Sequence, residues 1–197
     1  GLDLHLFKEQ INYLRKNYHI ITMEEVLFSI DNQSKIPSKS VLLTFDDAYS
    51  DHYENVFPIL DQHKIQGSFY APSKAISEHV VLDVNKIHFI LAAVQNKLDI
   101  IYDLKNLIET YKDQYKLDEF DSYYKTLAHA TRYDSKEVAF IKSLLQVTLI
   151  EELRLTIVDT LFQKYIGISE AALSREVYMS EDQLKHMLRS GQHIGNH

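Results

Sequence analysis

The stretch Val41-Leu42-Leu43-Thr44-Phe45-Asp46-Asp47 decides the fold. Its first five residues form an uninterrupted apolar and β-branched run, which is typical of a central strand buried on both faces. The following pattern predicts a helix from about Ser50 to Lys64, and Gly67–Ala71 predicts the next strand. A strand, a helix and a strand within about 30 residues form a βαβ unit, which requires parallel strands. The sequence therefore predicts an α/β fold.

The segment before this unit also alternates between helix and strand. Apolar residues recur at helical spacing over residues 6–14, and Tyr18–Ile21 is a short β-prone run. Thr22 and Glu25 form a capping box, which predicts that a helix begins there and continues to about Ile30. The first 75 residues or so therefore belong to one α/β segment.

The character of the chain changes between Pro72 and Tyr178. Within this block glycine occurs only at Gly167 and no proline follows Pro72, so we expect almost only helices. The predicted buried stripes are Ile87, Ile90, Leu91 and Val94, then Val138, Ile141, Leu144 and Leu145, and finally Leu153, Ile157, Leu161 and Phe162.

The α/β pattern resumes at the C-terminal end of the sequence. A second capping box at Ser180 and Gln183 opens a helix that ends near Gly191, and residues 192–197 predict a strand entering a turn. We therefore expect three segments, which are residues 1–75, a helical insertion over residues 76–178, and a return to the α/β fold over residues 179–197.

Composition excludes several classes of protein. An apolar content of 45% is ample for a buried core, which excludes a disordered chain. The net charge of −7 has the wrong sign for binding to phosphate backbones, so nucleic acid is not an expected partner. The longest apolar run, Phe89–Val94, has six residues, whereas a transmembrane helix needs roughly 20. Because cysteine is absent, any metal must be held by His, Asp or Glu.

Asp46 and Asp47 are the strongest candidates for chemistry. Two adjacent carboxylates at the end of a buried strand repel each other unless a cation or hydrogen-bond donors compensate, and a divalent metal would do so. Parallel α/β folds also carry their chemistry at the carboxyl ends of strands. The alternative is that the pair only caps the next helix, where the helix dipole favours negative charge.

The last seven residues, Gly191-Gln192-His193-Ile194-Gly195-Asn196-His197, are the second candidate segment. A histidine beyond a glycine turn can present a neutral imidazole to a metal shared with Asp47. The alternative is a pair of surface histidines, since the chain has ten histidines in all. Tyr49, close to the aspartates, is a candidate platform for stacking a sugar ring.

Together the two segments resemble the polysaccharide deacetylases, the carbohydrate esterase family 4 enzymes with a NodB-type domain. The resemblance covers about residues 5–75 and 178–197 and rests on Thr44-Phe45-Asp46-Asp47, on the Gly67–Tyr70 strand, and on Ser190–His197. It implies part of a distorted (β/α) barrel with a large all-helical insertion. It also implies a hydrolase that removes N-acetyl groups from sugar residues of a bacterial polysaccharide, at the cell envelope or after secretion.

The resemblance also implies roles for individual residues. Asp46 matches the catalytic base, Asp47 matches the first metal ligand, and His197 matches the first histidine of the metal motif. The implied cofactor is a divalent metal, with zinc the first choice. The substrate would be an N-acetylated polysaccharide or oligosaccharide, and the helical insertion is a candidate surface for a partner or for self-association.

Three departures from the family pattern bear on these expectations. Ala48 stands where the family usually has glycine, and Gln192-His193 stands where His-Glu is common, so His193 is not the expected ligand. In the family, a second metal histidine, an arginine-containing segment and a histidine general acid follow the position of His197. A catalytically incomplete module that binds carbohydrate or a protein partner is therefore the competing interpretation. An unrelated α/β protein is a third, and it predicts that Asp47 and His197 lie far apart.

Overall fold

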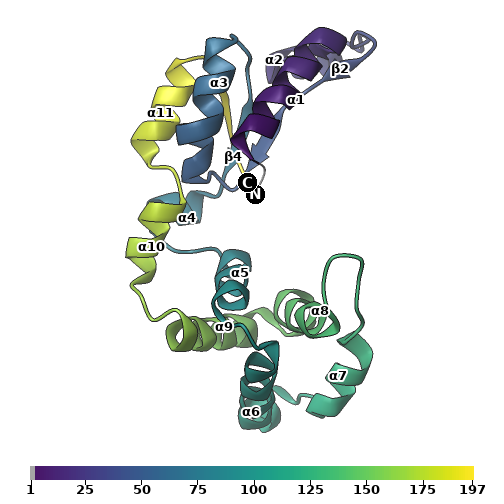
Figure 1. Cartoon of the computed structure of the whole chain (residues 1–197), viewed down its shortest axis with the longest axis vertical. Coiled ribbons are helices and arrows are strands. Elements are labelled where there is room, and N and C mark those ends of the chain that lie inside the picture. The colour runs from purple at the N-terminus through teal and green to yellow at the C-terminus, as the bar shows by residue number, and fades with distance from the viewer. Residues whose placement is uncertain (1–2) are drawn as a thin grey trace. The chain divides into compact units, whose positions relative to one another are not determined.

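The computed structural model describes residues 3–197 and contains two compact units. The first unit comprises the chain up to Val80 together with Glu170–His197, and the second unit comprises Val81–Ser169. Figure 1 shows that the chain leaves the first unit after α4 (Ser73–Ser77) and returns to it through α10 (Glu170–Val177).

The first unit alternates between helices and short strands, as the sequence predicts. Both predicted capping boxes are present, at Thr22 with Glu25 and at Ser180 with Gln183. Its further elements are α1 (Leu4–Asn17), β1 (His19–Ile20), α2 (Met23–Asp31), β2 (Ser40–Val41), β3 (Thr44–Asp46), η1 (His52–Val56), α3 (Phe57–Gln62), β4 (Ser68–Ala71), α11 (Glu181–Arg189) and β5 (His193–Asn196). The element η1 is a π-helical segment that runs directly into α3.

All strand pairs among the described elements are parallel. β1 pairs with β2 in one sheet, and a second sheet has the strand order β3-β4-β5. β3, the helical segment after it and β4 form the predicted βαβ unit. β5, from the C-terminal segment, pairs with the side of β4 that faces away from β3. In this register, Phe45 lies beside Phe69, and Phe69 lies beside Ile194. The mixed α/β class is therefore confirmed.

The prediction of one central strand over residues 41–45 is wrong. The run divides between two strands, because Val41 pairs with β1 whereas Thr44–Asp46 pairs with β4. β3 is consequently an edge strand, and Thr44 is exposed. The buried central strand is β4, in which Ser68 and Phe69 are fully buried.

The core of the first unit lies between the β3-β4-β5 sheet and the helices beside it. The rings of Phe45 and Phe69 stack with their centroids 4.7 Å apart. Gly67 permits this packing, since a β-carbon there would lie 2.8 Å from the Phe69 ring. On the helix side, the Tyr53 hydroxyl lies 2.9 Å from His186 Nδ1, so η1 and α11 lie side by side.

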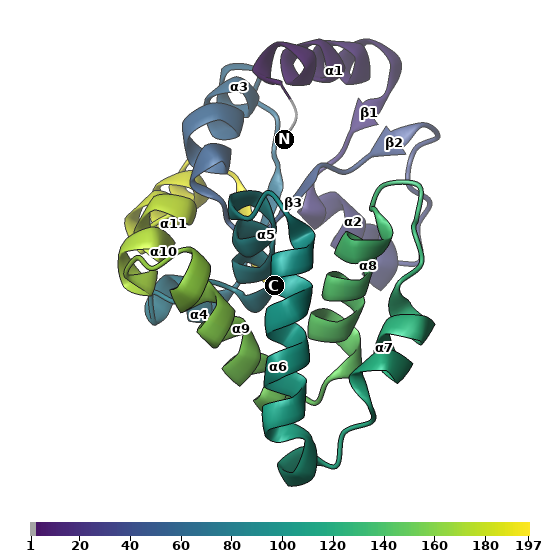
Figure 2. The ribbon, with the colours of Figure 1, turned by 60° about the horizontal axis from the view of Figure 1, so that its bottom comes forward.

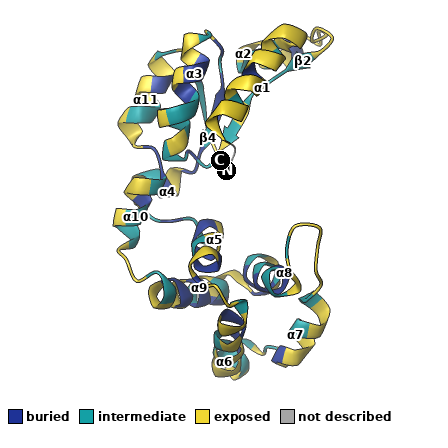
Figure 3. Cartoon of the chain, viewed as in Figure 1, coloured by how far each residue is buried: buried dark blue, intermediate teal, exposed yellow. Residues whose placement is uncertain are grey.

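The second unit contains only helices among its described residues. The predicted stripes are largely buried, with Ile90, Leu144 and Ile157 each no more than 1% exposed. Figure 2 shows these helices, and Figure 3 shows which parts of them are buried. The elements are α5 (Asp83–Ala93), α6 (Lys97–Tyr115), α7 (Phe120–Leu127), α8 (Lys136–Ser143), η2 (Leu144–Thr148) and α9 (Glu151–Tyr165). Across residues 3–197, none of the helices has the length and apolarity needed to traverse a bilayer.

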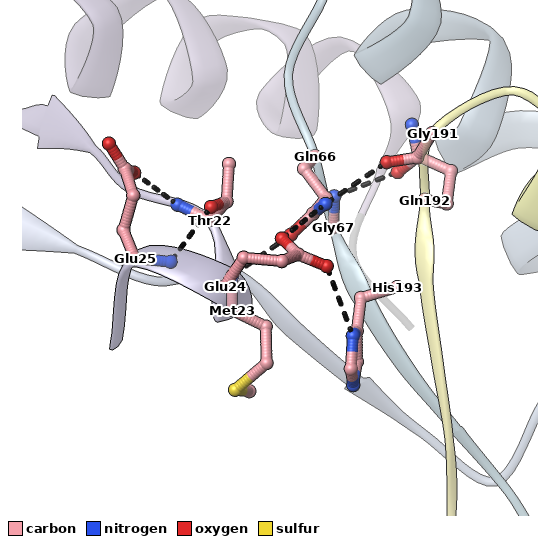
Figure 4. Close-up of polar contacts among 9 residues, drawn as sticks. All are labelled: Thr22, Met23, Glu24, Glu25, Gln66, Gly67, Gly191, Gln192 and His193. Carbon is pink, nitrogen blue, oxygen red and sulfur yellow. Dashed lines mark hydrogen bonds and ion pairs between the residues drawn. The ribbon is translucent and has the colours of Figure 1, made fainter. Parts of the chain in front are cut away.

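Two glutamine side chains connect the elements around β4 (Figure 4). Gln66 Oε1 accepts a hydrogen bond from the Met23 N–H, and its Nε2 donates to Glu24 and to the Gly191 carbonyl. Gln192 is 4% exposed; its Oε1 accepts from the Gly67 N–H at 2.7 Å and its Nε2 donates to the Ile65 carbonyl at 3.2 Å. The Gln192 side chain therefore pairs two backbone groups at the entrance to β4.

We expect Gln192→Ala to destabilise the first unit by on the order of 2–4 kcal/mol, because it leaves the Gly67 N–H and the Ile65 carbonyl buried without partners. Native-state hydrogen exchange of the β4 amides measures this change. Gln62→Ala, at an exposed glutamine, is the matched control and should change protection by less than about 0.5 kcal/mol. Equal effects of the two substitutions would contradict this account of Gln192.

Candidate active site

The two predicted aspartates lie at a sharp turn directly after β3. β3 ends at Asp46, and the next two residues both have positive backbone φ angles, 69° at Asp47 and 50° at Ala48. Residues with a β-carbon pay roughly 1–2 kcal/mol for this left-handed conformation. Such conformations persist only where the surroundings hold them, and they cluster at functional sites.

The segment that returns from the helical unit holds this turn. Ala48 is fully buried, and its carbonyl accepts a hydrogen bond of 2.8 Å from the Met179 N–H. Tyr49 and Tyr178 form an antiparallel bridge, and their rings stack with centroids 6.0 Å apart. One face of the Tyr49 ring is therefore covered by Tyr178, and the proposed role of Tyr49 as a sugar platform stays a prediction.

The structure brings Asp47 and His197 together. Pairing of β5 with β4 continues to His197, whose N–H donates to the Ala71 carbonyl at 3.1 Å. His197 Nε2 then lies 4.0 Å from Asp47 Oδ1. The side chains are 48% and 23% exposed, so the pair is open to solvent. The short distance contradicts the third interpretation, in which the two residues lie far apart.

The Asp47–His197 pair has a geometry that one zinc ion can bridge. Zinc binds carboxylate oxygen and imidazole nitrogen at about 2.0–2.2 Å, so two ligand atoms of a tetrahedral zinc ion lie about 3.4 Å apart. The observed separation of 4.0 Å is slightly longer, and a small movement of the half-exposed His197 side chain would close the difference. Both residue types are ordinary zinc ligands. Within residues 3–197 no group of three or more metal-binding side chains is gathered, so these two residues are an incomplete ligand set.

Asp46 lies on β3 and His193 lies on β5, the two strands that lead to Asp47 and His197. The surroundings of Asp46 and His193 differ. Asp46 is exposed, lies beside Tyr70 in the sheet register and directly precedes Asp47 in the chain. His193 Nδ1 lies 3.6 Å from Glu24 Oε1. Glu24 accepts a hydrogen bond from its own backbone N–H and one from Gln66, and these lower its pKa. His193 thus joins the Figure 4 network and not the candidate metal pair.

His52 is a residue of this region that the sequence analysis did not single out. It begins the π-helical segment, and its ring packs edge-on against Phe45 and Tyr49. Burial lowers its pKa below the usual value, although the negative charges of Asp51, Asp47 and Asp46 oppose this shift. Its Nδ1 is buried without a hydrogen-bond partner among the described residues. The sequence held one hint that His52 belongs to this region, which is its position in the first turn of the helix after the aspartates.

Comparisons with known proteins find the same family as the motifs. A family model described as polysaccharide deacetylase matches residues 33–136, which include Asp46 and Asp47. The match extends into the helical unit, which the resemblance left out, and does not reach residues 178–197, which the resemblance included. A putative polysaccharide deacetylase of Bacillus subtilis, YxkH, is 30% identical over 71 residues. The poly-beta-1,6-N-acetyl-D-glucosamine N-deacetylase of Escherichia coli K12 is 39% identical over 54 residues.

These similarities cover limited parts of the relatives. The Bacillus match spans 36% of this chain and 25% of the relative, and the Escherichia match spans 27% of this chain and 8% of the relative. No solved structure matches the chain significantly.

We expect Ala48→Val to destabilise the first unit by roughly 2–4 kcal/mol, because a β-branched side chain fits neither the positive φ nor the filled space around Ala48. Ala48→Gly is the matched control. It relieves the backbone strain but removes a buried methyl group, so its effect should stay within about 1 kcal/mol. Hydrogen exchange of the β4 and β5 amides measures both. A valine variant as stable as the glycine variant would refute the left-handed turn.

Proposed function

The chain belongs to the polysaccharide deacetylase family, and from this premise we propose that it is a metal-dependent hydrolase. It would remove N-acetyl groups from sugar residues of a bacterial polysaccharide. The observation that carries the proposal is the 4.0 Å separation of Asp47 Oδ1 and His197 Nε2, beside Asp46. Two residues from distant parts of the chain meet at the carboxyl ends of β3 and β5, where parallel α/β folds carry their chemistry.

We propose that Asp47 and His197 hold a divalent metal, with zinc the first choice. When bound, such a metal polarises a carbonyl oxygen and lowers the pKa of water. Asp46, one residue away, is then the general base. Because Asp46 and Asp47 are consecutive and the turn after them is held by Met179 and Tyr178, base and ligand keep a constant relative position.

The proposed reaction is hydrolysis of an acetamide. Asp46 accepts a proton from water as the water oxygen bonds to the acetamide carbonyl carbon. The carbon–nitrogen bond then breaks, the nitrogen takes up the proton that Asp46 accepted, and acetate and a free sugar amine are released. The exposed position of Asp46 leaves room for a polymeric substrate beside it.

For the substrate, we propose a polymer that contains N-acetylglucosamine. The support is the similarity to the Escherichia relative, which is named as a deacetylase of poly-beta-1,6-N-acetyl-D-glucosamine. We further propose that the two small parallel sheets are part of a distorted (β/α) barrel into which the helical unit is inserted, and that the protein acts at the cell envelope or after secretion. These proposals extend the family assignment.

One observation favours a second candidate function. The described residues gather only two metal-binding side chains at the site, because no group of three was found among them. If two ligands do not retain a metal, the chain is a deacetylase-like module that binds carbohydrate or a protein partner. Metal binding therefore separates the two functions.

Isothermal titration calorimetry with zinc should show one site on the unaltered chain. Asp47→Ala and His197→Ala should each weaken zinc binding at least about tenfold, because each removes one of two ligands. His193→Ala is the matched control on the same strand and should leave the affinity unchanged, since His193 contacts Glu24. Zinc binding that survives both ligand substitutions, or that is absent throughout, would refute the proposed metal site.

Acetate release from N-acetylglucosamine oligomers tests the proposed base. Asp46→Asn should reduce the rate by about 10²–10⁴-fold, the usual contribution of a general base, while zinc affinity stays the same. An equal loss of zinc binding in this variant would reassign Asp46 as a metal ligand. A variant with full activity would exclude Asp46 as the base.

A further inference from the structure

A cavity of about 590 Å³ lies between α1 and the segment that follows the aspartates. Phe7 and Gln10 of α1 form one side, and Phe45, Tyr49, Asp51 and His52 form much of the other. Its volume is within the usual range of small-molecule sites, about 300–1,000 Å³. Nothing in the proposed deacetylation uses this cavity.

This cavity lies on the other face of the sheet from the candidate base. Successive side chains of a strand point to opposite faces, so Phe45, which lines the cavity, and Asp46 point in opposite directions. The Phe45 ring instead contacts Phe7 of α1, with centroids 6.3 Å apart. A ligand in the cavity would therefore not occupy the position of the reacting acetamide.

The walls of the cavity are mainly aromatic. Phe7 meets Phe45 edge to face, and His52 meets both Phe45 and Tyr49 edge to face, at 5.6 and 5.7 Å. Such walls accept the apolar face of a flat or puckered ring and attract a positive charge through the ring quadrupole. Amide groups of Gln10 and Asn55 add hydrogen-bonding groups suited to ring hydroxyls.

The charge in this cavity is negative. Among the described residues that line it, the exposed Asp51 is the only charged one. Asn55 Nδ2 donates to Asp51 Oδ1 at 3.1 Å, which orients the carboxylate. Across residues 3–197, Asp51 forms no ion pair with a lysine, arginine or histidine. Burial lowers the pKa of the neighbouring His52 and so disfavours its charged form.

We propose that this cavity binds a ring that carries a primary ammonium group, specifically an amino sugar such as glucosamine. The ring would lie against the aromatic walls, its ammonium group would pair with Asp51, and its hydroxyl groups would meet Gln10 and Asn55. The choice of an amino sugar among such cations rests on the proposed function, because deacetylation of an N-acetylated sugar produces this chemical group. The cavity would thus hold a deacetylated unit close to, but outside, the reacting site.

The test is a titration followed by NMR of the full chain, with glucosamine, N-acetylglucosamine and glucose as probes at equal concentration. Glucosamine should shift signals of Phe7, Tyr49 and Asn55 and bind at least about fivefold more tightly than the two uncharged sugars. Asp51→Asn keeps the shape of the side chain and removes its charge, so it should abolish that preference. Glu54→Gln, an exposed carboxylate of η1 that does not line the cavity, is the matched control and should retain it.

Equal affinities for the three sugars, a preference that survives Asp51→Asn, or an absence of shifts at the cavity residues would each overturn the proposal. With a chelator present these outcomes are independent of turnover, because the proposed hydrolysis requires the metal. Failure of the deacetylase function is detected separately, by the absence of acetate release. A chain that binds glucosamine in this way but releases no acetate would support the cavity and refute the proposed function.

Discussion

The tight turn after β3 is the constraint on which the candidate site depends. Asp47 and Ala48 both adopt left-handed backbone conformations, which are unfavourable for residues with a β-carbon. The turn is retained because Ala48 is buried and hydrogen bonded to Met179, and because Tyr49 pairs with Tyr178. The chain segment that returns from the helical unit therefore shapes the turn that carries the aspartates.

The other half of the site depends on the position of β5. His197 reaches Asp47 only because β5 lies parallel to β4 in one register, and Gln192 secures the entrance to β4. The aromatic cavity also depends on β3. Phe45 points toward α1 and lines the cavity, whereas Asp46, the next residue of the strand, points to the opposite face. The end of β3 thus presents the exposed Asp46 on one face and the aromatic ring of Phe45 on the other.

Much of the local structure could be predicted from the sequence because its signals are local. Capping boxes, helical spacing and the βαβ pattern depend on residues within a few turns of one another, and these predictions are confirmed. The strand over residues 41–45 was predicted wrongly, because an apolar run does not reveal that its two ends pair with different strands. The positive φ angles at Asp47 and Ala48 were equally hidden, since neither residue is glycine. The meeting of Asp47 with His197 was expected from the histidine beyond the glycine turn and from the family resemblance. The place of His52 among three aromatic rings depends on tertiary packing.

The central claim is that Asp47 and His197 share one metal ion. Anomalous diffraction at the zinc absorption edge, from crystals of the chain grown with zinc, tests it most directly. The account predicts one strong peak about 2.0–2.2 Å from both Asp47 Oδ1 and His197 Nε2. A peak held by other residues, or zinc-grown crystals with no peak between these two side chains, would contradict it.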